Sequence, residues 1–181
     1  MHSWFGKVKN FKIKKGEHSS GFHFGFTFKR KVTFKAILDE SCLYTIADND
    51  RFDENKLFGF SSTYNHMIQS ARIGWRCVDG EKFEIVTYSH ENGKIDFADI
   101  KVLGEVLPNQ PFLCSIVEPP YYKNDPKAYY VFTFRIEGDS NISFTKNEKS
   151  KSYFPFQYFL FPYFGGNKTA PHDMSIKIEL L

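Results

Sequence analysis

Residues 70–88 read SARIGWRCVDGEKFEIVTY, an alternation of apolar and polar side chains interrupted once by Asp79-Gly80. Alternation with a period of two is typical of a half-buried β-strand, and an Asp-Gly pair is typical of a tight turn. The segment therefore predicts two adjacent antiparallel strands. With a two-residue loop, residue i lies opposite roughly residue 159 − i, so we expect Arg72 and Tyr88 to be near neighbours on the outward face. The inward face carries Ala71, Ile73, Trp75, Cys77, Phe83 and Ile85.

The same alternation continues over most of the chain. Clusters of Gly, Pro, Asn and Asp separate the alternating segments, and no sustained helical period is present. This pattern predicts an all-β fold, a two-sheet antiparallel sandwich or jelly roll (concanavalin-like), with residues 1–181 forming a single β-sandwich domain. The other predicted strands cover residues 21–30, 32–38, 42–46, 94–103, 112–117, 128–137, 141–145, 153–161 and 173–181.

Parity along these strands predicts which side chains form the core. In residues 21–30, GFHFGFTFKR, the phenylalanines fall on one face, opposite His23, Gly25 and Thr27. We expect the phenylalanine face to point inward, because it is the more apolar of the two. The predicted core includes Phe24, Phe26, Phe34, Trp75, Phe132, Phe134 and Ile176.

Composition predicts a folded, soluble chain. Apolar residues make up 41% of the 181 residues and aromatic residues 18%, which argues against disorder. No run approaches the roughly 20 apolar residues of a membrane-spanning helix, and the first residues lack the hydrophobic centre of a signal peptide. Cys42, Cys77 and Cys114 are odd in number and widely spaced, which predicts three unpaired, reduced thiols and synthesis in the cytoplasm without disulfides. The localisation itself stays unknown.

Positive charge is concentrated near the N-terminus. Residues 1–35 contain nine Lys or Arg and one acid, a net charge of +8, so the rest of the chain carries −5 of the overall +3. Such a segment is either a solvated edge or a surface for an anionic partner. Nucleic acid is not a favoured partner, because the phenylalanines interleaved with these lysines are assigned to the core and so cannot stack on bases.

The sequence contains no motif that assigns a catalytic residue, a cofactor or a metal ligand. It lacks GxSxG, HExxH, a P-loop and a GxGxxG that follows a strand. The acidic loop 47–55 places Asp48, Asp50 and Asp53 close together, and calcium prefers oxygen ligands of this kind. An exposed acidic turn is the favoured interpretation and a calcium site the alternative, since Phe52 stands where an EF-hand loop needs a ligand.

The outward faces of the predicted strands carry the most informative polar side chains. Arginine offers a rigid fork of donors and tyrosine an amphipathic ring, a combination that holds hydroxyl-rich or anionic ligands such as sugars. An ordinary solvated sheet face is the alternative interpretation. The predicted ligand-binding surface is built around Arg72, Arg76, Tyr88 and Arg135 and is closed at one end by His66 or Tyr163.

Four segments together resemble a family of small all-β, jelly-roll-like proteins encoded in Bacteroidota and in viruses associated with them. These segments are KKGEHSSG (14–21), NKLFGFSS (55–62), HMIQSARIGW (66–75) and FPYFGGNKTAPHDMSIKI (161–178). The biochemical role of that family is unknown. The resemblance implies an independent β-sandwich module, favours a carbohydrate-facing or virion-associated role, and carries over no catalytic residue.

Three functions follow from these observations. The leading hypothesis is a non-catalytic module that recognises a carbohydrate or a similar polar ligand on an open sheet face, with a protein as the other class of partner. The first alternative is a structural or assembly protein of a virion or cell surface, for which jelly rolls are common and a homo-oligomer would be expected. The second alternative is a glycan-cleaving enzyme, since paired carboxylates on facing strands need no local motif.

Overall fold

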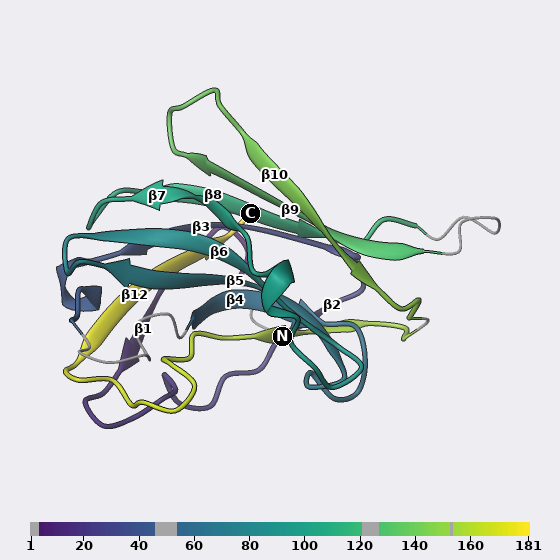
Figure 1. The fold of residues 1–181 in the computed structure, drawn as a ribbon, viewed down its shortest axis with the longest axis horizontal. Helices are drawn as coiled ribbons and strands as arrows, with labels where there is room; N and C mark the ends of the chain where they lie inside the picture. The colour runs from purple at the N-terminus through teal and green to yellow at the C-terminus, as the bar shows by residue number, and fades with distance from the viewer. Residues whose placement is uncertain (1–3, 46–53, 121–126, 153) are drawn as a thin grey trace.

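The structure, a computed structural model, describes residues 4–45, 54–120, 127–152 and 154–181. Its strands form two six-stranded sheets that lie face to face as a sandwich (Figure 1). Each strand pairing that it describes within these sheets is antiparallel. The predicted all-β, concanavalin-like class is therefore confirmed.

The first sheet has the order β1-β12-β3-β8-β9-β10. Its strands are β1 (Val8–Ile13), β12 (Met174–Leu180), β3 (Lys31–Leu38), β8 (Phe112–Val117), β9 (Ala128–Ile136) and β10 (Ser143–Lys149). The second sheet has the order β2-β11-β4-β5-β6-β7. Its strands are β2 (Phe26–Thr27), β11 (Gln157–Leu160), β4 (Asn55–Ser61), β5 (Gln69–Val78), β6 (Lys82–Glu91) and β7 (Val102–Val106).

Two of the predicted strands are partly replaced by short 3-10 turns. Of the predicted strand 42–46, Cys42 ends the turn η1 (Glu40–Cys42) and residues 43–45 form no strand, while residue 46 lies outside the described residues. Residues 94–103 contain η3 (Phe97–Asp99) before β7 begins. In both turns an Asp side chain caps the first backbone N–H groups: Asp39 accepts from the N–H of Ser41, and Asp96 accepts from that of Ala98. Among the described residues, no helix is long and apolar enough to cross a membrane.

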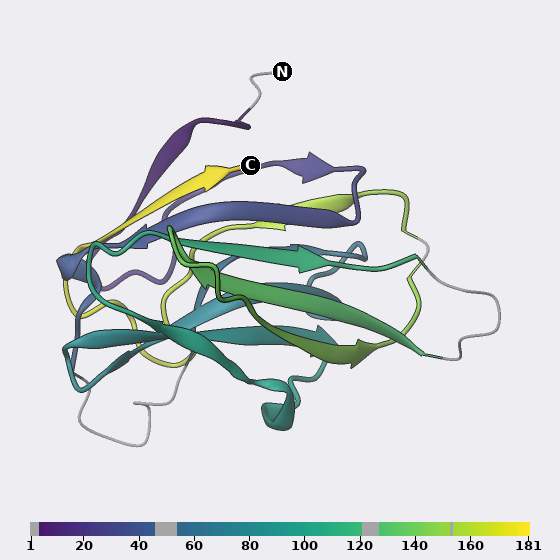
Figure 2. The ribbon, with the colours of Figure 1, turned by 90° about the horizontal axis from the view of Figure 1, so that it is seen from above.

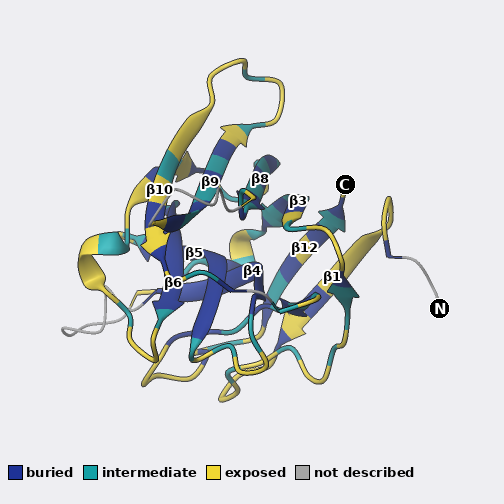
Figure 3. Ribbon diagram, turned by 90° about the vertical axis from the view of Figure 1, so that its right-hand side faces the viewer, coloured by how far each residue is buried: buried dark blue, intermediate teal, exposed yellow. Residues whose placement is uncertain are grey.

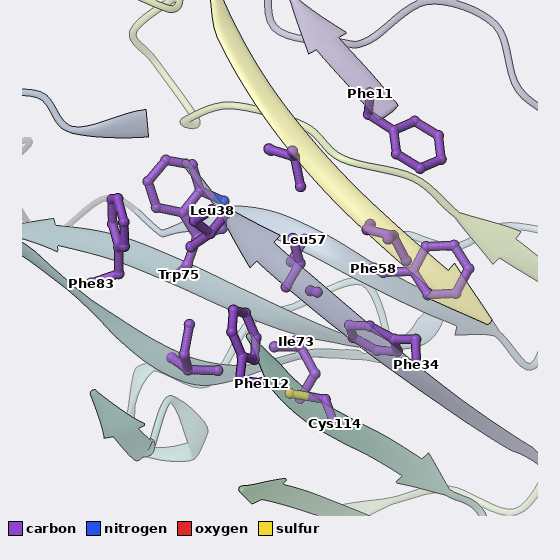
Figure 4. Close-up of a cluster of buried hydrophobic side chains, with 14 of the residues drawn as sticks. Phe11, Phe34, Leu38, Leu57, Phe58, Ile73, Trp75, Phe83, Phe112 and Cys114 are labelled. Atoms are coloured by element: carbon purple, nitrogen blue, oxygen red, sulfur yellow. The ribbon is translucent and has the colours of Figure 1, made fainter. Parts of the chain in front are cut away.

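The core lies between the sheets (Figure 3) and is rich in aromatic side chains (Figure 4). Phe34, Trp75, Phe132, Phe134 and Ile176 are all buried, as their parity predicts. Trp75 packs edge-on against Phe83, its close neighbour across the β5–β6 hairpin, with ring centroids 5.4 Å apart. The three cysteine thiols are free and buried.

The hairpin of residues 70–88 confirms the predicted contact of Arg72 with Tyr88, which lie directly opposite each other. Its connection is longer than predicted, because Val78 pairs with Lys82 and three residues lie between them. Asp79 and Gly80 both have positive φ angles, 54° and 72°, as a tight turn between twisted strands requires. The register is therefore shifted by one residue from the predicted one.

The prediction for residues 21–30 was wrong about which face is buried. Only Phe26–Thr27 pair as a strand, Phe24 is 73% exposed, and Phe26 is only half-buried. The face with the smaller side chains points inward instead: Thr27 is buried, and a Cβ atom on Gly25 would lie 2.7 Å from the Phe159 ring. The physical reason is that large rings from other segments already fill this edge of the interior, namely Trp4, Phe11, Phe58, Phe159 and Phe161.

This correction also removes the reason for discounting nucleic acid. Phe22, Phe24 and Phe28 are 93%, 73% and 74% exposed, so the rings next to the basic residues are available to a partner. Figure 2 shows β2 at the rim of the molecule, close to the C-terminus.

Candidate ligand-binding face

The candidate site lies on the outer face of the second sheet, across β4, β5 and β6. Arg72 occupies the middle of this face, with Gly59 opposite it on β4 and Tyr88 opposite it on β6. Their neighbours Phe60, Ile73 and Thr87 point the other way, into the sandwich. Although they lie on the outer face, Arg72 and Tyr88 are only 8% and 6% exposed, and β4 beside them is buried along its whole length. The expectation of an open sheet face is therefore wrong at this position.

A β-bulge places Lys56 on the same face. The register of β4 with β5 shifts between Lys56 and Phe58, so that Leu57 and Phe58 are both buried while Lys56 lies opposite Gly74. The Lys56 ammonium donates to the carbonyl of Gly165 at 2.8 Å and lies 4.8 Å from the centroid of the Tyr88 ring. A second cation, the Lys56 ammonium, thus contacts the ring of Tyr88, which is the neighbour of Arg72 on β6.

Residues 161–166 form the border of this face beside Lys56. The backbones of Lys56 and Tyr163 exchange two hydrogen bonds of 2.8 and 2.9 Å, which makes this segment an irregular continuation of β11. The ring of Tyr163 is half-buried and stacks on that of His18 at 5.1 Å. Arg72 donates from Nη2 to the carbonyl of Phe161 in the same segment.

One hydrogen-bond donor of the Arg72 guanidinium has no acceptor among the described residues. This donor is the Nε atom, which is buried. Burial lowers the pKa of Arg72 to about 10, and the neighbouring phenol groups of Tyr88 and Tyr163 oppose that decrease. The guanidinium remains charged at neutral pH, and a buried charge with an unsatisfied donor favours an anionic acceptor.

Two histidines complete the site. His90 lies on β6 two residues after Tyr88, and its Nδ1 is 3.4 Å from the Ser70 hydroxyl. Burial lowers the pKa of His90 to about 4, with further contributions from His66, Arg72 and Lys56. Burial and Arg72 also lower the pKa of His66, which is half-buried in the loop between β4 and β5. We call Lys56, Arg72, Tyr88 and His90, together with the border residues His66 and Tyr163, the polar cluster.

Stability is expected to depend on pH through His90. Its pKa is about 4 in the folded protein and 6.5 ordinarily, so the unfolded chain binds more protons between these values. The free energy of unfolding should therefore fall as the pH is lowered from 6.5 to 4. Urea unfolding at several pH values should show this decrease in the wild type and a weaker one in His90→Asn. His172→Asn, which changes a half-buried histidine outside the polar cluster, should keep the wild-type decrease.

The structure brings four of the six predicted site residues together. Arg72, Tyr88, His66 and Tyr163 come together in the polar cluster. Arg76 shares their face, but its guanidinium pairs with Glu84 at 2.5 Å and with Glu54 at 3.5 Å.

Arg135 does not join these residues. It belongs to β9 in the first sheet and is exposed on the opposite side of the sandwich. The expected convergence of Arg135 with Arg72 and Tyr88 is therefore wrong, because the two hairpins enter different sheets.

The calcium interpretation falls on Asp48, Asp50 and Asp53, which lie outside the described residues. Within the described ranges, no three His, Cys, Asp or Glu side chains are grouped so that they could hold a metal ion.

Sequence reasoning missed two members of the polar cluster. His90 could have been found by extending the parity of β6 by two residues. Lys56 could not, because simple alternation puts it in phase with the buried Phe58 and Phe60, and only the bulge reverses its direction.

Comparison with solved structures shows the same fold in several alginate lyases. The marine PL-14 alginate lyase from Aplysia kurodai matches with a TM-score of 0.58 at 12% identity, over 96% of this chain and 80% of that one. Alginate lyase vAL-1 from Chlorella virus matches with a TM-score of 0.51 at 15% identity, over 96% and 82%. A double mutant of alginate lyase Aly36B in complex with an alginate trisaccharide matches with a TM-score of 0.58 at 11% identity, over 95% and 78%. At such identities the likeness shows the fold alone.

No protein-family profile matches the chain, and neither does any curated protein sequence.

Proposed function

We propose that the polar cluster binds an acidic carbohydrate. The observation that carries this proposal is the buried Arg72 guanidinium, whose Nε has no acceptor among the described residues and whose neighbour Lys56 adds a second cation. A carboxylate or sulfate group presents the paired oxygens that such a donor needs. An anion would also reduce the repulsion between the two cations.

The surroundings of the cations favour a sugar over a small inorganic anion. Tyr88 and Tyr163 supply aromatic rings that end in a hydroxyl group. The hydroxyls of Ser61 and Ser70, on the neighbouring positions of β4 and β5, are fully buried and contribute nothing to a ligand. The tyrosine rings and hydroxyls suit the apolar faces and hydroxyl groups of a sugar. The likeness to alginate lyases supports a uronate, a sugar that carries a carboxylate, as the first ligand class to test.

Cleavage of the same ligand by β-elimination is the second candidate function. The Tyr88 and His90 rings are 5.4 Å apart, and the low pKa of His90 keeps its imidazole neutral at pH 7. A neutral His90 could accept the proton from the carbon beside the carboxylate, which Arg72 would neutralise. The glycosidic C–O bond would then break, a C=C bond would form, and the Tyr88 phenol would give a proton to the leaving oxygen.

The test is alginate binding by calorimetry with variants that change one group at a time. Arg72→Met should weaken binding about ten- to a hundredfold, since a hydrogen bond to a charged group contributes about 1.5–3 kcal/mol. Tyr88→Phe, which keeps the ring, should weaken it less. Arg135→Met is the matched control, because it removes an exposed arginine from the other sheet, and it should bind like the wild type.

Thermal melts separate loss of folding from loss of binding, and Arg72→Lys provides a second variant that keeps the buried charge. Binding by folded Arg72→Met equal to that of the wild type would contradict the proposal. So would wild-type binding to a neutral glucan as strong as to alginate, or no binding to alginate at all. Ultraviolet absorbance from a new double bond during the incubation would assign the lyase function.

A further inference from the structure

Five phenylalanines form an aromatic surface along β2 and the segment before β11, in which Phe24 and Phe28 are exposed and the other three are half-buried. The Phe26 ring lies 6.0 Å from that of Phe24, 5.5 Å from Phe28 and 5.9 Å from Phe156. Single exposed apolar side chains are ordinary, whereas a contiguous aromatic patch indicates a binding surface. We call this surface the phenylalanine strip; it consists of Phe24, Phe26, Phe28, Phe154 and Phe156.

The phenylalanine strip lies on the same sheet face as the polar cluster. Tyr158 of β11 pairs with Phe26 on one side and with Ser61 of β4 on the other. Ser61 pairs with Ser70, which pairs in turn with His90. Residues directly opposite in an antiparallel ladder point to the same face, so this row crosses the sheet from the strip to the cluster.

The direction of that row follows from its buried neighbours. Four members of the row each have a buried residue next to them in the sequence. These buried neighbours are Thr27, Phe159, Phe60 and Ala71. Because successive side chains alternate, the row itself points away from the core. Ser61 and Ser70 in its middle are fully buried, and the Ser61 hydroxyl donates to the Thr63 and Gln69 carbonyls, so a ligand that reaches from the strip to the cluster would pass over these residues. Two exposed lysines, Lys29 and Lys31, add positive charge just beyond the strip.

We propose that the phenylalanine strip extends the polar cluster into one binding face for a chain of acidic sugars. The inference rests on the proposed function and adds that the ligand is a polymer. Three strand spacings separate β5 from β2, about 14 Å, so a single sugar cannot touch both Arg72 and Phe26. Sugar rings would pack their apolar faces on the phenylalanines while their charges meet Lys29 and Lys31.

The experiment measures affinity for alginate oligosaccharides of increasing length. The wild type should bind more tightly as the oligosaccharide grows long enough to span both areas. The double variant Phe24→Ser/Phe28→Ser should bind the shortest oligosaccharides like the wild type but the longest about tenfold more weakly, given the usual strength of two aromatic contacts. Its melting temperature should be unchanged, because both rings are exposed. Phe144→Ser is the matched control, since Phe144 is 69% exposed on β10 of the first sheet.

The outcomes distinguish this inference from the proposed function. If the double variant binds long oligosaccharides like the wild type while Arg72→Met does not, the inference is wrong and the proposed function stands. If the wild type binds no oligosaccharide of any length, both are wrong. If the double variant keeps all alginate binding but loses self-association, or binding to single-stranded DNA or anionic vesicles, the strip serves that other partner and the inference is wrong.

Discussion

Replacing Glu118 by glutamine is expected to lower the free energy of unfolding by about 3–5 kcal/mol, the range found when one partner of a buried ion pair is removed. Glu118 is completely buried at the end of β8 and accepts from the Lys149 ammonium at 2.5 Å and from the Arg30 guanidinium at 2.7 Å. Its second carboxylate oxygen accepts from the Ser62 hydroxyl at 3.1 Å. Glutamine has nearly the same shape but no charge.

The large effect follows from the burial of Lys149, whose side chain is also fully inaccessible. Burial lowers the pKa of Lys149, and only Glu118 and other nearby carboxylates oppose that decrease. Without the negative charge of Glu118, the Lys149 ammonium stays buried with much less opposite charge to offset the cost of its desolvation. Urea unfolding at pH 7 measures the loss.

Glu148→Gln is the matched control. Glu148 pairs with Lys127 at 2.6 Å, but both side chains are largely exposed, so this change should cost no more than about 1 kcal/mol. Equal effects of the two substitutions would show that burial does not determine the strength of the Glu118 pair.

Replacing Gly59 by alanine is expected to destabilise the second sheet by more than about 3 kcal/mol, above the usual range for overpacked sites. A Cβ atom at Gly59 would lie 2.0 Å from the carbonyl oxygen of Ala71 and 2.6 Å from the Cα of Arg72. Both are backbone atoms of β5, so no side-chain rotation relieves the clash. The β4–β5 pairing beneath Arg72 would have to separate.

Gly138→Ala tests whether any glycine replacement has this effect. Gly138 has a φ of 86°, but a Cβ atom there would meet nothing within 4 Å. Its replacement costs only backbone strain, of the order of 1–3 kcal/mol. Chemical denaturation should rank Gly59→Ala as the more destabilised variant; the opposite order would show that the close approach at Gly59 is easily relieved.

Much of the fold could be predicted because local alternation persists through most strands. Trp75 and Phe34 are buried where parity places them, and the Asp79-Gly80 turn makes β5 and β6 neighbours. Two of the six residues of the polar cluster follow from that one hairpin, since Arg72 and Tyr88 are opposite each other on it. These features depend on residues close in sequence, which is why the sequence suffices.

The rest depends on contacts between distant segments. Arg135 belongs to an outward strand face as predicted, but strand order assigns it to the other sheet. Lys56 joins the polar cluster through a bulge that alternation cannot reveal. Residues 161–166 meet Lys56 only after more than a hundred intervening residues have formed the sheet.

The all-β class, the alternating segments and the proximity of Arg72 to Tyr88 could be predicted from the amino-acid sequence, because each is a property of residues close together in the chain. Which face of residues 21–30 is buried depends instead on packing against distant segments. That segment alternates large and small side chains, so either face could have packed inward. The Trp4, Phe11 and Phe161 rings occupy the interior at this edge, and they leave room for Gly25 and Thr27 but not for the phenylalanines.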